Sequence, residues 1–140
     1  INMEKQNIRT VTAEQLGELV DFISIDVAFI SLDKVLPVAT TLLKNTGSLV
    51  ALIKPQFEAG KEKVGKGGIV RERAVHEEVL SRILQVAYDC KLYLHGLTFS
   101  PIKGTEGNIE FLGFFTKSEE GALSITDELI TAVVDEAHTL

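Results

Sequence analysis

The sequence predicts an α/β fold built on a mostly parallel sheet with an antiparallel last strand. Segments with strand-like and helix-like patterns alternate along the 140 residues, which favours parallel strands with helices packed on the sheet faces. Residues 48–53 form a nearly continuous apolar run, which is typical of a strand buried on both faces. The connection at residues 101–108 is too short for a crossover helix, so the two strands that flank it should pair antiparallel.

The first expected elements are a short helix and a strand. Thr12 and Gln15 have the spacing of a capping box, in which two side chains bind the first free amides of a helix. We expect that helix to end near Leu19 and a strand to occupy residues 22–26.

A second helix is expected after Ser31, followed by the apolar strand at residues 48–53. Pro37 is acceptable only near the start of this helix or at a kink, and Gly47 is placed to end it. The apolar residues that recur at helical spacing are Val35, Leu36, Ala39, Leu42 and Leu43.

Residues 54–68 are expected to form a long loop. The segment holds Pro55, four glycines and alternating charges, and it follows the carboxyl end of a strand. Open α/β sheets bind their ligands at that end of the strands.

The remainder of the chain predicts a helix at residues 71–90, a strand at 92–99, a last strand at 109–116 and a closing helix that begins at 124–127. Both helices carry one apolar stripe at helical spacing. The stripe of the first consists of Val75, Val79, Ile83, Val86 and Ala87, and that of the second of Ile125, Leu129, Ile130, Val133 and Val134.

The beginning of the sequence does not fit a complete doubly wound domain. Ile1, Asn2 and Met3 resemble the end of a strand that is already in progress, so we expect the sheet to be incomplete at its N-terminus. We find no repeat and no linker, and we expect residues 1–140 to form part of a single domain.

Composition excludes several classes of protein. A hydrophobic fraction of 45% and a charged fraction of 24% suit one globular domain, and no run reaches the ~18 apolar residues of a membrane span, so we expect a cytoplasmic protein. Cys90 is the only cysteine, which excludes an internal disulfide and a thiolate zinc cluster. The histidines at 76, 95 and 138 are dispersed, so we expect no metal site.

Charge is unevenly distributed. The formal net charge is -6, yet residues 54–73 hold six basic and three acidic side chains, a local balance of 6 - 3 = +3. Such a cluster is either a solvated loop surface or a place where RNA phosphates bind.

Three charged residues fall at the ends of, or inside, expected strands. Asp26 ends the first strand, Lys54 follows residues 48–53, and Glu110 lies within the last strand. Because a buried charge without a partner is strongly unfavourable, we expect these groups to meet one another or a ligand.

Longer motifs carry a family resemblance. Residues 21–32, the segment Lys-Pro-Gln-Phe-Glu at 54–58 followed by Gly-Lys-Gly-Gly at 65–68, and residues 100–110 resemble the signatures of TlyA-type ribosomal RNA 2'-O-methyltransferases, a family often labelled hemolysin. The similarity extends to the FtsJ-like methyltransferases. The resemblance implies a Rossmann-like methyltransferase sheet and a cytoplasmic enzyme that uses S-adenosyl-L-methionine to methylate ribosomal RNA, alone or within a ribosomal subunit.

The resemblance also implies site residues. The related enzymes share a Lys-Asp-Lys-Glu tetrad, and Asp26, Lys54 and Glu110 match its last three members, while the first lysine has no counterpart in this sequence. Asp26 and Asn7 would border the cofactor. Lys54 is the candidate base and would have to lose its own proton before it could accept one from a ribose hydroxyl.

The glycine-rich loop that follows Lys54 is the candidate contact for RNA. Consecutive backbone amides near lysines suit a phosphate, and an aromatic side chain could stack on a base that leaves its helix. The residues expected to bind RNA are Lys61, Lys63, Lys66, Arg71 and Phe57.

The family's glycine-rich cofactor loop is absent from this sequence, so we expect residues 1–140 to be inactive alone and to supply the RNA-binding side of the site. Two alternatives stay open: a non-catalytic RNA-binding module, and a membrane-active hemolysin. No apolar or amphipathic segment of the sequence favours the second alternative.

Overall fold

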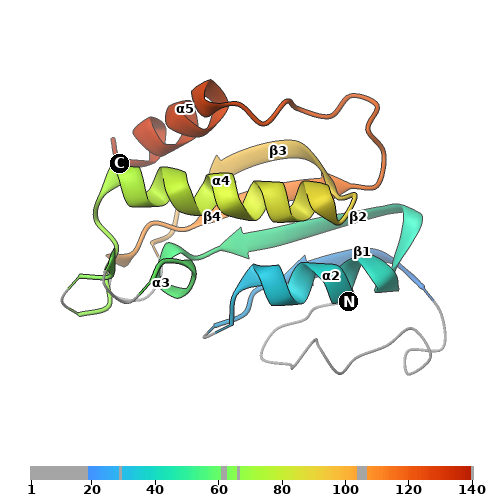
Figure 1. The fold of residues 1–140 in the computed structure, drawn as a ribbon, viewed down its shortest axis with the longest axis horizontal. Helices are drawn as coiled ribbons and strands as arrows, with labels where there is room; N and C mark the ends of the chain where they lie inside the picture. The colour runs from blue at the N-terminus through green and yellow to red at the C-terminus, as the bar shows by residue number, and fades with distance from the viewer. Residues whose placement is uncertain (1–18, 29, 61–62, 66, 104–106, 140) are drawn as a thin grey trace.

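A four-stranded mixed sheet forms the centre of the described structure (Figure 1). The computed structural model describes residues 19–28, 30–60, 63–65, 67–103 and 107–139. Its elements, in chain order, are β1 (Val20–Ile25), α2 (Leu32–Leu42), β2 (Leu43–Ile53), α3 (Pro55–Glu58), α4 (Arg73–Asp89), β3 (Tyr93–Phe99), β4 (Phe111–Thr116) and α5 (Asp127–Ala137). The expected helix before residue 19 lies outside the described residues.

The strand directions confirm the predicted sheet. The order is β1-β2-β4-β3, with β1 parallel to β2 and with β4 antiparallel to both β2 and β3. Three of the four described strands therefore share one direction, and the last strand runs against them. The place of β4 between β2 and β3 is a finding of the structure, because residue patterns do not order strands within a sheet.

The helices bury their apolar stripes against the sheet. α2 and α4 lie side by side across one face, while α5 packs against α4 and β3 (Figure 1). The fully buried side chains of α4 include Val79, Ile83 and Ala87, which confirms the predicted stripe. Each buried Leu, Ile or Val side chain contributes about 1.5–3 kcal/mol to folding, so these stripes hold the layers together.

Two local predictions were wrong. Gly47 does not end a helix, because α2 passes directly into β2 at Leu43 and Gly47 lies within the strand. A Cβ atom at position 47 would stand 2.6 Å from Leu43 Cδ1 and 2.9 Å from the Asp21 carbonyl oxygen, so glycine allows β1 and β2 to approach. Glu110 lies just before β4 and not inside it.

The expected loop at residues 54–68 begins with a helical turn. α3 starts at Pro55, and a proline is favoured at the first helical position, where its missing N–H leaves no bond unmade. Lys54 is the residue that precedes α3, and its carbonyl oxygen accepts a hydrogen bond from Phe57 N at 2.9 Å. The turn therefore fixes the backbone of Lys54 at the end of β2.

Candidate active site

Sheet topology brings the three expected catalytic residues to one end of the sheet. Lys54 follows the last residue of β2 and Asp26 follows the last residue of β1, which runs parallel to β2. Ile53 is paired with Phe111 in the antiparallel register of β2 and β4, so Glu110 stands beside Lys54 in sequence register. Residues that are far apart in the chain thus meet at the carboxyl ends of the parallel strands.

Lys54 and Asp26 form an ion pair. Lys54 Nζ lies 2.5 Å from Asp26 Oδ1, and the side chains are 17% and 38% exposed, respectively. The contact directs the Lys54 Nζ atom toward the end of β1. The pair remains accessible from solvent through Asp26, so a ligand can reach it.

Glu110 is held by a different partner. Its side chain is buried, with the residue 8% exposed, and its Oε2 atom accepts a hydrogen bond from Gln56 Nε2 at 3.1 Å. The Glu110 carbonyl oxygen accepts from Ser100 N at 2.8 Å, which anchors the backbone beside β3. The described contacts therefore link Glu110 to α3, and they link Lys54 to β1.

Gln56 is a residue that sequence reasoning did not assign to the site. Its Oε1 atom is buried and has no hydrogen-bond partner among the described residues. A buried acceptor without a donor is unfavourable by about 1–3 kcal/mol, so an unpaired atom of this kind needs a structural or functional explanation. Gln56 lies two residues after Lys54 in the Lys-Pro-Gln-Phe-Glu segment. This position is the sequence signal from which a role in the site could have been predicted.

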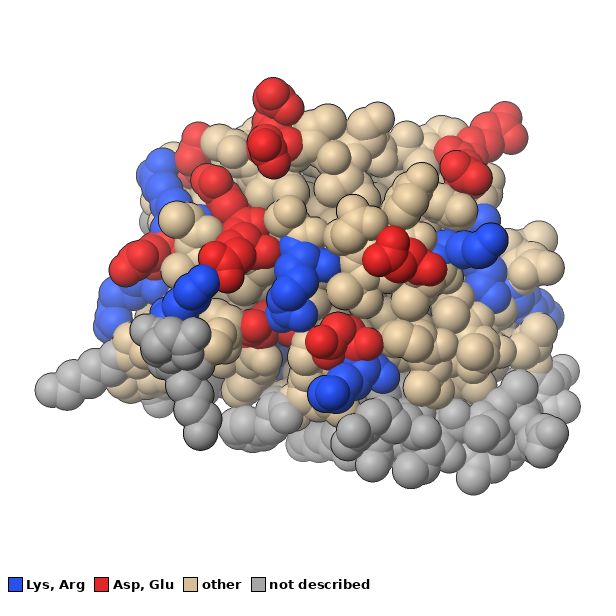
Figure 2. Space-filling view, viewed as in Figure 1, with Lys and Arg blue, Asp and Glu red and all other residues tan. Residues whose placement is uncertain are grey.

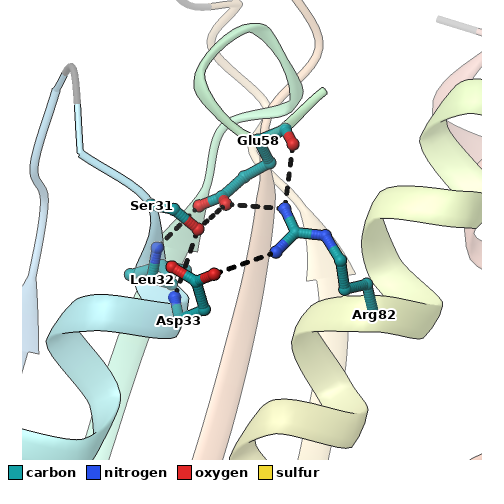
Figure 3. Close-up of polar contacts among 5 residues, drawn as sticks. All are labelled: Ser31, Leu32, Asp33, Glu58 and Arg82. Atoms are coloured by element: carbon teal, nitrogen blue, oxygen red, sulfur yellow. Dashed lines mark hydrogen bonds and ion pairs between the residues drawn. The ribbon is translucent and has the colours of Figure 1, made fainter. Parts of the chain in front are cut away.

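A buried carboxylate fixes α3 in place (Figure 3). The Glu58 side chain is 2% exposed; it accepts hydrogen bonds from the Ser31 hydroxyl, from Leu32 N at 2.9 Å and from Arg82 Nη2 at 3.0 Å. Burial raises the pKa of the Glu58 carboxyl, while the three donors lower it. Arg82 also donates to the Glu58 carbonyl oxygen at 2.8 Å.

These bonds join the start of α2, the end of α3 and the middle of α4. The cluster thereby holds the short helix that carries Gln56 and follows Lys54. Sequence reasoning assigned no role to Glu58 or Arg82, because the two residues are 24 positions apart and only the packing of α3 on α4 brings them together.

The expected RNA-binding residues do not all share one environment. Lys61 and Lys66 lie outside the described residues. Lys63 Nζ binds both carboxylate oxygens of Glu78, at 2.6 and 2.7 Å, and Phe57 lies half-buried in α3. Lys63 and Arg71 line a cavity of about 550 Å³ whose walls also include Glu72 and Glu78. This cavity is therefore lined by side chains of both charges.

The same mixture covers the face formed by α2 and α4. Figure 2 shows Lys and Arg side chains interspersed with Asp and Glu over this face, without one continuous basic surface. The far end of the loop is pinned by Asn108, which accepts from Val70 N and donates to the Gly68 carbonyl oxygen, both at 2.9 Å.

Metal binding and membrane insertion are two other functions that can be compared with the described residues. Within them, no group of three or more His, Cys, Asp or Glu side chains is arranged to hold a metal ion. Among the helices of the described ranges, none combines the length and the apolar character needed to cross a membrane.

S-adenosyl-L-methionine, the cofactor implied by the resemblance, needs partners for its amino acid, ribose and adenine groups. Of the two residues expected to border it, Asn7 lies outside the described residues, and the Asp26 carboxylate is bound by Lys54. One partly occupied carboxylate does not form such a site. The described residues thus do not provide a complete set of partners for this cofactor.

Comparisons with known proteins agree with this geometry. YqxC of Bacillus subtilis, a candidate rRNA methyltransferase by its name, is 47% identical over 97% of this chain and 50% of its own length. The protein of Mycobacterium tuberculosis named 16S/23S rRNA (cytidine-2'-O)-methyltransferase TlyA is 34% identical over 87% of this chain and 46% of its own length. Hemolysin A of Brachyspira hyodysenteriae is 39% identical over 82% of this chain and 48% of its own length.

Solved structures show the same fold. A Streptococcus thermophilus protein named as a candidate hemolysin is 43% identical and superposes with a TM-score of 0.87 over 96% of this chain and 49% of the other chain. A Lactococcus lactis protein named in the same way is 39% identical, with a TM-score of 0.85, over 99% of this chain and 66% of the other chain.

The chain spans about half the length of the curated relatives that it matches. The FtsJ-like methyltransferase family matches residues 1–117, which include Asp26, Lys54 and Glu110. With a matching fold, matching relatives and three charged groups gathered at the carboxyl end of the sheet, this chain belongs to the FtsJ-like methyltransferase family.

Proposed function

We propose that the protein containing this chain methylates a ribose 2'-hydroxyl of ribosomal RNA, with S-adenosyl-L-methionine as the methyl donor. The observation that carries the proposal is the Lys54–Asp26 ion pair, 2.5 Å long, at the carboxyl ends of β1 and β2 and beside Glu110. The names of relatives from Mycobacterium tuberculosis and Campylobacter jejuni, both rRNA (cytidine-2'-O)-methyltransferases, support ribosomal RNA as the substrate.

We also propose that residues 1–140 form the C-terminal part of a single methyltransferase domain. A ribosomal RNA substrate would place the whole protein in the cytoplasm. The cofactor, when bound, supplies an electrophilic methyl group. The residues of this chain must then orient the ribose hydroxyl and remove its proton.

Lys54 is the proposed acceptor of that proton. Asp26 orients the Lys54 side chain. An ammonium cannot accept a proton, so Lys54 acts as the base in its neutral amine form.

Gln56 and Glu110 are the proposed positioning pair. The Gln56 amide donates to Glu110, which leaves the Gln56 carbonyl oxygen directed to no described donor. Through the bond to Glu110, Gln56 orients the Glu110 carboxylate beside Lys54. Positioning of this kind lowers the barrier because the reacting groups no longer need to find their geometry at each turnover.

Single-turnover methylation of ribosomal RNA by the whole protein tests the proposal. Lys54→Ala should abolish methyl transfer while RNA binding falls only slightly, and Lys54→Arg should also be inactive because a guanidinium keeps the charge but does not act as a base. Lys44→Ala is the matched control, since it removes the Lys44–Asp21 ion pair, 3.1 Å long, at the opposite end of β2.

Turnover by Lys54→Arg at the wild-type rate would exclude Lys54 as the base. A wild-type protein that binds RNA and shows no methylation would instead favour the non-catalytic RNA-binding module.

A further inference from the structure

A second cavity, of about 290 Å³, lies beside the residue that precedes Glu110 and differs from the cavity of about 550 Å³ in the charge of its lining residues. Its charged or titratable lining residues are Arg71, His76, Lys103 and His138, and no acidic side chain lines it within the described ranges. We call this cavity the basic pocket. Its size is close to the lower end of the ~300–1,000 Å³ range of small-molecule sites, so it can hold part of a nucleotide but not a folded partner.

The two histidines of the basic pocket are joined by a hydrogen bond. His76 Nε2 lies 3.1 Å from the Val70 carbonyl oxygen, and His76 Nδ1 lies 2.8 Å from His138 Nε2. A carbonyl oxygen only accepts, so His76 carries its proton on Nε2, and its Nδ1 accepts a hydrogen bond from His138. The pair links the end of α5 to α4 and gives the basic pocket a rigid wall.

The charges around the pair are predominantly positive. Burial lowers the pKa of His138, nearby Arg73 and Lys103 lower it further, and Asp135 opposes them. Asp135 and Arg73 form an ion pair at 2.9 Å, so their two charges offset each other, and Lys103 is the cation of this group without a described carboxylate partner. An added anion would therefore experience a favourable field.

Arg71 and Lys103 differ from most other basic residues of the described structure. Five others form ion pairs with carboxylates: Lys44, Lys54, Lys63, Arg73 and Arg82. Neither Arg71 nor Lys103 pairs with a described carboxylate, although both side chains are exposed and line the same pocket. Two exposed cations that face one cavity without a counter-ion among the described residues are suited to an anionic ligand.

The basic pocket is fixed relative to the candidate catalytic residues. Ile109, which lines it, immediately precedes Glu110, and the buried Asn108 side chain accepts from Val70 N at 2.9 Å. A ligand in the basic pocket would consequently lie beside the segment that carries Glu110.

We propose that the basic pocket binds a backbone phosphate of the RNA substrate, through Arg71 and Lys103, close to the nucleotide that is methylated. This inference rests on the proposed function, because it assigns a contact to the same RNA. It adds Lys103 to the loop residues that the sequence indicated. It assigns the phosphate contact to Arg71 and not to Lys63, because Lys63 is bound to Glu78.

RNA binding by the whole protein tests the inference. The double variant Arg71→Gln/Lys103→Gln should bind a ribosomal RNA fragment about tenfold more weakly in fluorescence anisotropy, and the slope of log affinity against log salt should fall by about one. The matched control is Lys44→Gln/Lys91→Gln, which removes the same charge near the beginnings of β2 and β3, and it should leave both quantities unchanged. Circular dichroism checks that both variants fold.

A second measurement identifies the ligand. Inorganic phosphate at millimolar concentration should shift the imidazole NMR signals of His76 and His138 in the wild type but not in Arg71→Gln/Lys103→Gln, and the RNA fragment should displace it. Equal loss of RNA affinity in both double variants would overturn the inference, since only total charge would then matter. Phosphate-dependent shifts without any loss of RNA affinity would also overturn it, and would assign the pocket to free phosphate.

The outcome is independent of the test of the proposed function. RNA binding is read here without turnover, so the basic pocket can be confirmed if Lys54→Arg remains active, and it can be overturned if Lys54→Arg is inactive.

Discussion

His76 makes the stability of this protein depend on pH. The residue is fully buried, and burial together with nearby His138 lowers its pKa from 6.5 to about 4, although the bond to the Val70 carbonyl opposes the shift. In the unfolded chain the imidazole titrates near its ordinary pKa. Between those two values the unfolded state binds a proton that the folded state does not, so the free energy of unfolding falls as pH falls.

The magnitude follows from the same two pKa values. Each pH unit in this window changes the free energy of unfolding by about 1.4 kcal/mol, so lowering the pH from 7 to 5 removes about 2 kcal/mol through His76. The loss is complete below pH 4, where both states are protonated, and the stabilisation is fully present above pH 6.5. A loss of 2 kcal/mol is a large part of the ~5–15 kcal/mol that stabilises a typical domain.

Urea unfolding at pH 7, 6 and 5 measures this effect. His76→Gln, which removes the titrating group, should be less stable at pH 7 but should lose about 2 kcal/mol less than the wild type between pH 7 and pH 5. His95→Gln is the control, because His95 lies on β3 and its Nε2 atom contacts the Ser118 carbonyl oxygen, away from the pair. An identical decline with pH in the wild type and His76→Gln would refute the reasoning.

Three further predictions concern the site and its support. Gln56→Met removes the amide but keeps a similar volume, and it should reduce the rate of methylation by about 10- to 100-fold. The free energy of unfolding should change by less than ~1 kcal/mol, because the variant loses one hydrogen bond together with one buried acceptor that has no described donor. Unchanged turnover would argue against a positioning role. Glu58→Ala should lower the free energy of unfolding by about 2 kcal/mol, since Leu32 N and Arg82 lose a buried partner. Asp33→Ala, which removes an exposed contact of 3.7 Å with Arg82, should lower it by less than about 1 kcal/mol. Equal losses in urea unfolding would contradict the role given to burial. In a filter-binding assay with labelled S-adenosylmethionine, residues 1–140 alone should show no appreciable affinity, and tight binding would mean that the cofactor site lies among the residues of this chain.

Local patterns were sufficient for the types and approximate limits of most elements. The stripe on α4 was predictable because burial of one helix face repeats every three to four residues, and the direction of β4 was predictable from the short connection before it. Gly47 was misassigned for the reason that a glycine signals either a helix end or a close approach. Only the distance from position 47 to the Asp21 carbonyl distinguishes the two.

The sequence by itself determined the α/β class, the strand-end positions of Asp26 and Lys54, and a family resemblance that its motifs carry. Tertiary structure decided the partners: Lys54 with Asp26, Glu110 with Gln56, Glu58 with Arg82, and His76 with His138. The physical reason is the range of the interactions. Helix periodicity and turn preferences act over a few residues, whereas hydrogen bonds and ion pairs between residues 24 to 62 positions apart depend on how strands and helices pack in three dimensions.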